Sequence, residues 1–506
     1  LLDLPQKNQL EFLCILIISL FFFKNLFHAS IIFYQGKVVK NLRIYISQKL
    51  FSYYLNQDYL NLVRKNSAVI IRILSVDVGN TSIYILNLFN LLKESLILVA
   101  IVCLLFFSNT EITIFLFLIF FLVVAVYYLL NKKKLLQRGK KVQGLISNVI
   151  NIIHEMIGLF KELKIYNLNN YIYNNYSNKI KEAEKYQFIN YFIISLPRLF
   201  LELTAVILIV SIIFMQLQKD SNAVNILPFL SLVVVVAVRM IPVFNTFTTS
   251  LSNLKSIQPS FDLVFSELSN LRKIKNENKE IETIKFENKI EIKNISFKYQ
   301  KDDSNIIDNL SLNIQKGDKI GLVGESGTGK STLINIIMGL LKQTQGKIYV
   351  DNKELLTKKN QLIANIGYVP QEVFLIEGEL KKNIALGVDI EEISQEKLIK
   401  ASDAAQITNF VENLDKSFDS LVEENGRNFS VGQKQRIGVA RALYKDPDIL
   451  ILDESTSSLD VETEEKFIKD IFNISENKTI IFISHKMSAL VKCDKIFDLK
   501  QKMFIK

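Results

Sequence analysis

Five apolar stretches in the first half of the chain are each long enough to cross a lipid bilayer, which takes about 20 residues of helix. They cover residues 10–33, 84–107, 112–130, 191–215 and 226–247. A single stretch of this kind could be a fully buried helix of a soluble protein. Five of them in a chain of 506 residues instead predict an all-α transmembrane helical bundle.

Basic residues predict the orientation of this bundle, because cytoplasmic segments carry an excess of Lys and Arg. The segments after the first and third stretches are the basic ones. Their cations are Lys37, Lys40, Arg43, Lys49, Arg64, Lys65 and Arg72, followed by Lys132, Lys133, Lys134, Arg138, Lys140 and Lys141. The turns at residues 108–111 and 216–224 contain a single basic residue, Lys219, so we expect both turns on the outer side of the membrane. The net charge of +10 follows from the same asymmetry, and no nucleic-acid module is visible, so no nucleic-acid partner is expected.

Both basic segments keep apolar residues at helical spacing, which predicts helices that extend from the spans into the cytoplasm. We expect these helices to reverse near residues 56–62 and 167–170, where their tips would contact a soluble domain. Five spans leave Leu1 outside. Because the chain does not begin with Met, we expect that the first helix of the bundle lies upstream and is missing here.

The second half has the composition of a soluble α/β protein. Strand-like runs at residues 290–297, 319–323, 449–452 and 479–483 alternate with helical segments, which predicts a mainly parallel sheet flanked by helices. The charge-mixed segment ahead of it is typical of a linker. The predicted organisation is a transmembrane domain over residues 1–268, a linker over 269–289 and an α/β domain over 290–506.

A glycine-rich loop follows the second of these strands and opens a helix. It contains Gly324, Glu325, Ser326, Gly327, Thr328, Gly329, Lys330 and Ser331, followed by Thr332, and it matches G-x-x-x-x-G-K-[ST]. Glycines let backbone N–H groups close around phosphate oxygens, and the helix N-terminus adds positive potential. The nine residues therefore predict a nucleotide site, in which Lys330 reaches the β- and γ-phosphates and Ser331 binds Mg²⁺.

An apolar strand over residues 449–452 ends in two carboxylates, Asp453 and Glu454. Asp453 is placed to hold Mg²⁺ through water, and Glu454 to orient or deprotonate the attacking water. A surface acidic pair is the alternative, but a buried strand that ends in adjacent acids, on the same chain as a phosphate loop, argues against it.

Three further residues are weaker candidates. His485 follows the strand at residues 479–483 and can act as a γ-phosphate sensor. Gln371, in Val-Pro-Gln, can bridge Mg²⁺ or the attacking water. Tyr299 lies 25 residues before Gly324, where an aromatic ring can stack on adenine. Taken alone, each of the three also fits a structural role. For Tyr299 this role is that of an aromatic residue packed on a strand.

Residues 290–506 resemble the nucleotide-binding domain of ATP-binding cassette (ABC) transporters. The likeness is carried, in chain order, by Tyr299, residues 324–331, Gln371, the Phe-Ser-Val-Gly-Gln segment at 429–433, residues 449–454, residues 458–460 and His485. The resemblance implies that two such domains pack head to tail, so that ATP at Lys330 of one is capped by Ser430, Gly432 and Gln433 of the other. One cassette per chain implies a dimer, a homodimer in the simplest case and a heterodimer otherwise.

The segment at residues 429–433 departs from the commoner Leu-Ser-Gly-Gly-Gln of this family. Phe429 replaces the Leu and Val431 replaces the first Gly. The Ser430 hydroxyl and the N–H of Gly432, which approach phosphate, are retained. We expect a hydrolytic site because Glu454 is present, with a slowed rate as the alternative.

The membrane half resembles the exporter type of ABC transporter, and within it the bacterial flippases of lipid-linked oligosaccharides. That likeness implies a multi-pass protein of the cytoplasmic membrane, with its ATPase domain in the cytoplasm and a lipid or lipid-linked substrate. Arg239 lies inside an apolar run, where a cation costs about 2.5–3.5 kcal/mol on insertion, and we expect it to attract an anionic headgroup. Arg198 is a second substrate candidate, although an i,i+4 pair with Glu202, or snorkelling to lipid headgroups, explains it equally well. Export of peptides, drugs or other lipids, and a non-transporting membrane ATPase, are the alternatives.

Overall fold

The computed structural model describes the backbone of the chain except for a set of short gaps. These are residues 1–5, 109, 220–222, 276–281, 301–303, 326, 356–359, 362–365, 455–467, 470, 473–477 and 485–489. The described part also excludes the side chains of residues 6–10, 104–108, 110–113, 115–116, 212–213, 215–219, 223–237, 239, 271–275, 282–283 and 360–361. The chain divides into two units, Leu1–Gln57 with Asn61–Lys275, and Asp58–Leu60 with Asn276–Lys506.

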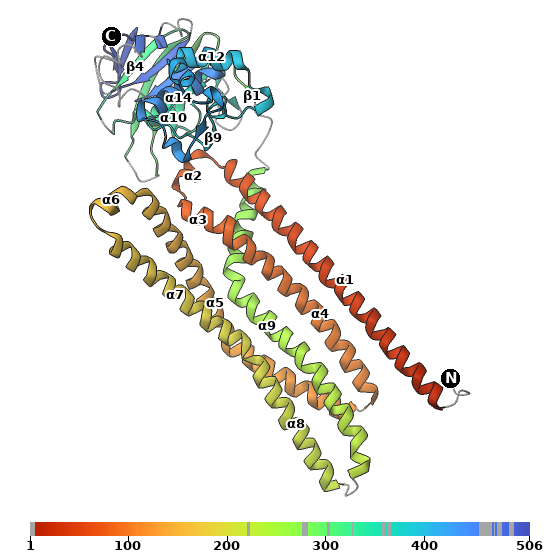
Figure 1. The fold of residues 1–506 in the computed structure, drawn as a ribbon. Coiled ribbons are helices and arrows are strands. Elements are labelled where there is room, and N and C mark those ends of the chain that lie inside the picture. Colours follow the sequence, from red (N-terminus) through yellow and green to blue (C-terminus); the bar gives the residue numbers. More distant parts are fainter. Residues whose placement is uncertain are drawn as a thin grey trace. The chain divides into compact units, whose positions relative to one another are not determined.

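The first unit consists of helices joined by short turns in its described part (Figure 1). Its helices are α1 (Gln6–Leu55), α2 (Tyr59–Arg64), α3 (Ser67–Arg72), α4 (Val78–Ser108), α5 (Thr110–Gly158), α6 (Phe160–Ile165), α7 (Asn169–Ser195), α8 (Pro197–Lys219) and α9 (Ala223–Lys275). A π-helical turn, Ile73–Asp77, joins α3 to α4. Helix α4 packs along α9, and α5 packs against both α7 and α9.

The five predicted apolar stretches all lie in these helices, in α1, α4, α5, the α7–α8 pair and α9. Within the described residues, three helical runs are long and apolar enough to cross a membrane: Glu11–Leu55, Ser67–Cys103 and Asn169–Ser211. Helix α9 continues to Lys275, so the start of the segment predicted as a linker is helical. Residues 269–275 contain neither Gly nor Pro and include good helix formers, which allows the helix to continue.

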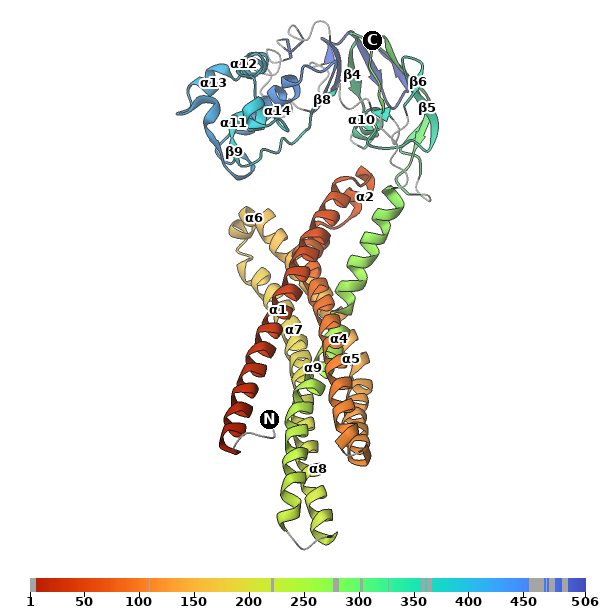
Figure 2. The same cartoon turned by 90° about the vertical axis from the view of Figure 1, so that its right-hand side faces the viewer.

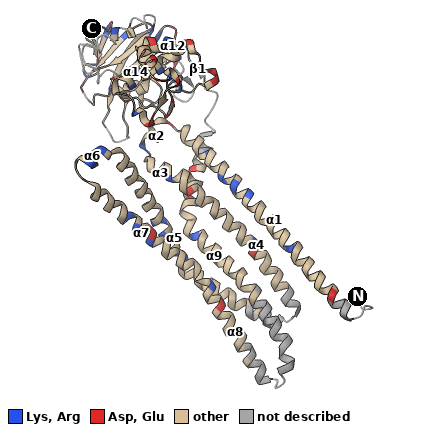
Figure 3. Cartoon of the chain, viewed as in Figure 1, with Lys and Arg blue, Asp and Glu red and all other residues tan. Residues whose placement is uncertain are grey.

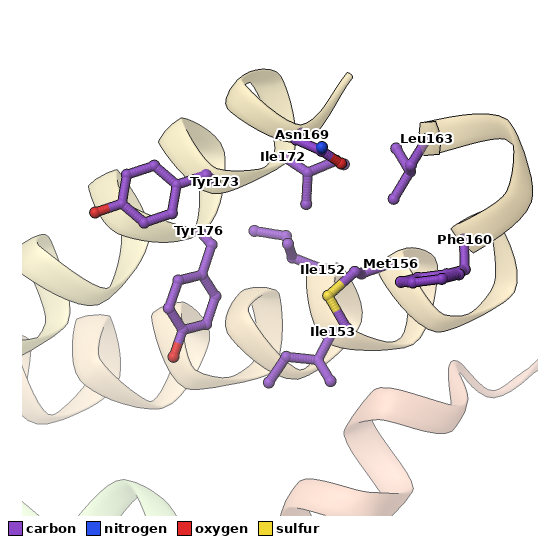
Figure 4. A pocket seen from close by; sticks show the side chains of 9 residues that line it. All are labelled: Ile152, Ile153, Met156, Phe160, Leu163, Asn169, Ile172, Tyr173 and Tyr176. Carbon is purple, nitrogen blue, oxygen red and sulfur yellow. The ribbon is translucent and has the colours of Figure 1, made fainter. Parts of the chain in front are cut away.

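The reversal predicted near residues 167–170 falls between α6 and α7, where Asn167 adopts a left-handed φ of 55°. Helices α5, α6 and α7 enclose a cavity of about 350 Å³ beside this reversal. Its lining is mainly apolar, with Met156 and Phe160 on one side and Ile172 on the other (Figure 4).

A buried polar cluster holds three segments of the first unit together. The Arg72 Nε donates to Asp77 Oδ2 at 2.9 Å, and the Asp77 side chain is only 1% exposed. Asp77 Oδ1 also accepts from Gln143 Nε2 at 3.0 Å and Ser260 Oγ at 2.7 Å. The cluster therefore ties the π-helical turn to α5 and α9, and its hydrogen bonds offset the cost of burying the ion pair.

The second unit contains two larger sheets and two short strand pairs (Figure 2). Strands β4 (Lys319–Val323), β8 (Ile366–Val369), β11 (Ile449–Asp453), β12 (Thr479–Ile483), β13 (Lys495–Asp498) and β14 (Met503–Phe504) form a sheet of order β14-β13-β4-β12-β11-β8. Strands β2 (Lys289–Phe297), β3 (Ile307–Gln315), β5 (Gln345–Val350) and β6 (Lys353–Glu354) form an antiparallel sheet of order β3-β2-β5-β6. The short pairs are β1 (Glu282–Thr283) with β7 (Asn360–Gln361), and β9 (Gly378–Glu379) with β10 (Leu421–Val422).

The helices of the second unit are α10 (Lys330–Ile337), α11 (Leu380–Ile384), α12 (Gln395–Ala404), α13 (Thr408–Glu412) and α14 (Val431–Tyr444). Successive residues of β11 alternate between two hydrophobic cores: Leu450 and Leu452 enter one, and Ile449 and Ile451 enter the other. Burial on both faces explains why this strand is a continuous apolar run in the sequence.

Candidate functional site

Four neighbouring parallel strands bring the predicted phosphate and metal residues to one edge of the six-stranded sheet. The strands β8, β11, β12 and β4 pair side by side, with Leu452 opposite Val369, Asp453 opposite Ile483, and Ile483 opposite Leu322. Their carboxyl ends therefore lie together, and ligands of open α/β sheets bind outside such ends. The parallel sheet predicted from the sequence accounts for this convergence.

The phosphate loop takes its shape from glycines. Gly327 and Gly329 have φ values of 84° and 93°, in a region that other residues rarely adopt, and Gly329 caps the start of α10. A Cβ on Gly324 would lie 2.5 Å from Thr328 Oγ1, so the close approach at this position requires glycine.

Lys330 lies inside this loop. Its ammonium donates to the carbonyl oxygens of Gly324 at 2.7 Å and Glu325 at 3.2 Å, and the residue is 6% exposed. Burial lowers the pKa of Lys330, while the carboxylates of Glu454 and Asp453 raise it. The loop thus concentrates one positive charge where phosphate oxygens would bind. Ser331 is exposed at the first turn of α10, and Ser326 lies outside the described residues.

The two carboxylates at the end of β11 have different surroundings. Asp453 is 8% exposed and burial raises its pKa, although a hydrogen bond from the Tyr368 hydroxyl, 3.2 Å from Oδ2, lowers it. Glu454 has a left-handed φ of 48°, a strained conformation for a residue other than glycine. This left-handed conformation turns the chain directly after Asp453. The Glu454 Oε2 accepts a hydrogen bond from Gln371 Nε2 at 2.7 Å.

Tyr368 was not identified from the sequence as part of this site. It lies on β8, three residues before Gln371, and pairs with Ile451 on the neighbouring strand. Asp453 is two residues further along β11 and so projects from the same face of the sheet as Ile451. The sequence signal that could have identified Tyr368 is an aromatic residue with a hydroxyl group on a strand that leads into Val-Pro-Gln.

Tyr299 lies just after β2, beside the phosphate loop. Its hydroxyl is 3.1 Å from Thr332 Oγ1, and its ring meets that of Phe297 edge-on with 5.0 Å between centroids. These contacts fix the ring position next to the first turn of α10. They are compatible both with adenine stacking and with the packed aromatic that the sequence left as an alternative.

The segment at residues 429–433 forms the start of α14. Ser430 is the N-cap: its Oγ accepts from the N–H of Gln433 at 3.2 Å, and Gln433 Oε1 accepts from the N–H of Ser430 at 2.8 Å. This reciprocal pair is a capping box. Because the Ser430 Oγ serves as an acceptor in the cap, its own proton is left to donate to an anion.

Both departures from the commoner segment now have a structural explanation. Phe429 is 7% exposed and packs edge-on against Phe410, with 5.7 Å between ring centroids, so it anchors α14 in the core. Val431 is 63% exposed, so its branched side chain faces solvent. Within the second unit, helix α14, which follows Ser430, and helix α10, which begins at Lys330, lie apart (Figure 2).

Oxygen ligands of the type that Mg²⁺ prefers converge at the strand ends. Asp453 supplies a carboxylate and Ser331 a hydroxyl. Gln371 retains its amide oxygen, since its Nε2 is the atom bonded to Glu454. The donor set fits a magnesium ion held together with nucleotide phosphates.

Of the remaining predicted residues, the structure describes the side chain of Arg198 but not that of Arg239, and it does not describe His485. Arg198 Nε donates to Glu202 Oε1 at 2.7 Å across one turn of α8, which is the alternative that the sequence offered. Arg239 belongs to α9, but its side chain is outside the described residues, as are His485 and residues 458–460.

Comparison with known proteins gives a family match within the second half. The profile of the ABC transporter family matches residues 307–457. The resemblance predicted from the motifs is thereby confirmed.

Curated relatives align with about two fifths of the chain. ABC transporter B family member 6 of Dictyostelium discoideum is 39% identical over 219 residues, 42% of this chain and 32% of the relative. The ATP-dependent lipid A-core flippase of Pseudomonas aeruginosa is 36% identical over 222 residues, 44% of this chain and 37% of the relative. The alpha-hemolysin translocation ATP-binding protein HlyB of Escherichia coli O157:H7 is 39% identical over 208 residues, 41% of this chain and 29% of the relative. The aligned region thus spans about a third of the length of these relatives.

A solved structure extends the likeness to the helical half. A bacterial Atm1-family ABC exporter with ATP bound matches with a TM-score of 0.74, covering 93% of this chain and 82% of that chain at 19% identity. At this identity the match shows the fold. The predicted fold class, a helical exporter-type membrane domain followed by an α/β nucleotide-binding domain, is confirmed.

Proposed function

We propose that this chain is one half of an ATP-driven exporter that hydrolyses ATP at two composite sites of a dimer. The observation that carries the proposal is the convergence of Lys330, Asp453, Glu454 and Gln371 at one sheet edge, in a chain whose other half carries helices long and apolar enough to cross a membrane. A soluble ATPase would not need such helices.

Each residue at the sheet edge has a role in the proposed reaction. Lys330 neutralises the β- and γ-phosphates, and its burial strengthens that electrostatic interaction. Asp453, Ser331 and Gln371 would hold Mg²⁺, which supplies charge neutralisation for the phosphates when bound. Glu454 accepts the proton of the attacking water, and its hydrogen bond from Gln371 fixes the orientation of the carboxylate. His485 is proposed to sense the γ-phosphate, and Tyr299 to stack on adenine.

The second half of each site would come from the other subunit. Ser430 and Gly432 stand at the N-terminus of a 14-residue helix, where backbone N–H groups and the macrodipole favour an anion. Helix α14 lies apart from α10 of the same chain (Figure 2), so a second copy is proposed to supply Ser430 to Lys330. A homodimer is the simplest such assembly.

The substrate is proposed to be a lipid-linked oligosaccharide or another anionic lipid, taken from the cytoplasmic side of the cell membrane. Support for it comes from Arg239 in the apolar part of α9 and from the resemblance of the membrane half to flippases. The names of the curated relatives include a lipid flippase, a toxin translocator and multidrug proteins, so they do not select one substrate.

The test is ATPase activity of the purified chain in liposomes. Glu454→Gln should lower turnover by about 10²–10⁴-fold while ATP still binds, because the amide is isosteric but cannot take a proton. Glu377→Gln removes an exposed carboxylate in the same domain and should leave turnover unchanged. A wild-type turnover no higher than that of Glu454→Gln would refute hydrolysis.

A separate arm tests the substrate. A lipid-diphosphate-linked glycan should raise wild-type turnover and move to the outer leaflet, and Arg239→Ala should reduce both effects. If that lipid leaves turnover unchanged in both proteins, the lipid-linked substrate is wrong even where ATP hydrolysis stands.

A further inference from the structure

A pocket between α1 and the start of α4 has no place in the ATP site or in the substrate residues discussed so far. Its volume is about 570 Å³, within the range of small-molecule sites. The lining comes from two parts of the first unit, residues 36–43 of α1 and residues 75–83 of the π-helical turn and α4. The residues are Gly36, Val39, Lys40, Arg43, Ser75, Val76, Gly79, Asn80, Ser82 and Ile83.

Two glycines keep this pocket open. A Cβ on Gly36 would meet nothing within 4 Å. A Cβ on Gly79 would lie 3.6 Å from Arg43 Nη2, so the Arg43 guanidinium lies beside the backbone of α4 at this glycine.

The pocket is positively charged. Lys40 and Arg43 line it, and none of its lining residues is acidic. Within the described part of the chain, neither cation forms a salt bridge. Asp77, the acid nearest to Ser75 in sequence, is fully engaged by Arg72, Gln143 and Ser260 and does not neutralise them.

The other polar groups of the pocket are already bonded. Ser75 Oγ donates to the carbonyl of Ile71 at 2.6 Å, and Ser82 Oγ to that of Val78 at 3.1 Å. Asn80 Nδ2 donates to Ser260 Oγ at 3.2 Å. The ammonium of Lys40 and the guanidinium of Arg43 are therefore the donors that a ligand would meet.

The position of the pocket along α1 suggests where its ligand comes from. The first apolar stretch ends at residue 33, so Gly36 and Lys40 follow it by about 5 and 10 Å at 1.5 Å per residue. The polar layer on each side of a bilayer is about 5–8 Å thick. The pocket would thus begin at the depth of lipid headgroups. Figure 3 shows Lys and Arg at several positions along α1.

We propose that the α1–α4 pocket binds a phosphate group through Lys40 and Arg43. Guanidinium groups bind phosphate in a bidentate manner, and an ammonium adds a second point charge. The phosphate belongs either to a lipid headgroup of the cytoplasmic leaflet or to a soluble phosphate ester, with the same donors in both cases. The inference rests on the proposed membrane setting of α1 but not on ATP hydrolysis or transport.

The experiment measures binding of dioctanoyl phosphatidic acid, dioctanoyl phosphatidylcholine and inorganic phosphate to the whole chain in detergent, by titration calorimetry. Wild type should bind phosphatidic acid saturably and at least tenfold more tightly than phosphatidylcholine. Lys40→Gln with Arg43→Gln should weaken that binding at least tenfold. The control, Lys37→Gln with Lys49→Gln, removes the same charge from the same helix outside the pocket and should change it less than twofold.

A second variant tests the pocket without altering charge. Gly36→Leu should fill the space and abolish binding, whereas Gly144→Leu, at an equally open helical glycine outside the pocket, should not. Displacement of phosphatidic acid by inorganic phosphate at similar concentrations would assign a soluble source, and its failure to compete would assign the lipid. Equal losses in both charge variants, or no saturable binding of either phosphate probe to wild type, would overturn the proposal.

Discussion

We predict that the hydroxyl of Tyr368 strengthens metal binding by Asp453. Tyr368→Phe removes one oxygen and keeps the ring, so the strand pairing of β8 with β11 should survive. In the wild type, the hydroxyl lies 3.2 Å from Asp453 Oδ2, on a carboxylate that is 8% exposed. The substitution leaves that carboxylate without its tyrosine donor.

The size of the effect follows from the geometry. A hydrogen bond to a charged group contributes about 1.5–3 kcal/mol. Strong O–H···O⁻ bonds are 2.5–2.7 Å long, so a bond of 3.2 Å belongs at the lower end of that range. About 1.5 kcal/mol corresponds to roughly a tenfold change in an equilibrium constant. We therefore expect the free Mg²⁺ concentration for half-maximal ATPase activity to rise by about tenfold.

The pH dependence has a definite sign. Burial already raises the pKa of Asp453, and the Tyr368 hydrogen bond lowers it by favouring the carboxylate. Losing that bond raises the pKa further, so more of Asp453 is protonated at any given pH. Since Mg²⁺ binds the carboxylate, the defect of Tyr368→Phe should be larger at pH 6 than at pH 8.

The assay is ATPase activity in liposomes, titrated with Mg²⁺ at both pH values. Tyr349→Phe, on β5 of the antiparallel sheet, removes a hydroxyl from the same unit and should leave the titration unchanged. A half-maximal Mg²⁺ concentration for Tyr368→Phe within twofold of wild type at pH 6 would refute the reasoning.

Two further substitutions probe the cap of α14 and the buried polar cluster. Ser430→Ala should lower the free energy of unfolding by about 1 kcal/mol and also reduce ATPase activity. Ser430→Asn should restore stability, because Asn is a good N-cap, but it should not restore activity. Thermal unfolding and ATP turnover measure the two effects, and recovery of activity with Asn would argue against a role for the hydroxyl. Asp77→Asn should destabilise the protein by about 3 kcal/mol, because it leaves Arg72 buried opposite a neutral amide. Thermal unfolding should show this loss while Glu184→Gln, at an exposed position on α7, shows none, and equal midpoints for the two would contradict it.

Much of the candidate nucleotide site could be predicted because its chemistry is local. Gly324 to Ser331 form one continuous loop, and Asp453 and Glu454 are adjacent, so residue type and spacing carried the information. The apolar runs of β4, β11 and β12 further indicated parallel strands, which bring those segments to one edge. Tyr368 could not be found in this way, because its role depends on its register against a strand more than eighty residues later.

The unusual segment at residues 429–433 shows what the sequence could not predict. The sequence established that Phe429 and Val431 depart from the commoner residues but not where their side chains point. That direction is set by the rotation of α14 against the core, where Phe410 meets Phe429 and leaves Val431 in solvent. The same holds for the side chain of Arg198. Its position in the sequence fitted both a substrate contact and a pair with Glu202, and the structure shows the pair with Glu202.

The sequence by itself determined the two-part architecture and the identity of the phosphate loop, because bilayer length, apolar periodicity and glycine spacing act over short stretches of chain. Only the tertiary structure decided which groups meet: Gln371 with Glu454, Tyr368 with Asp453, and Lys40 and Arg43 of α1 with the start of α4. These contacts depend on strand register and helix packing between residues far apart in the chain, and no local pattern encodes them.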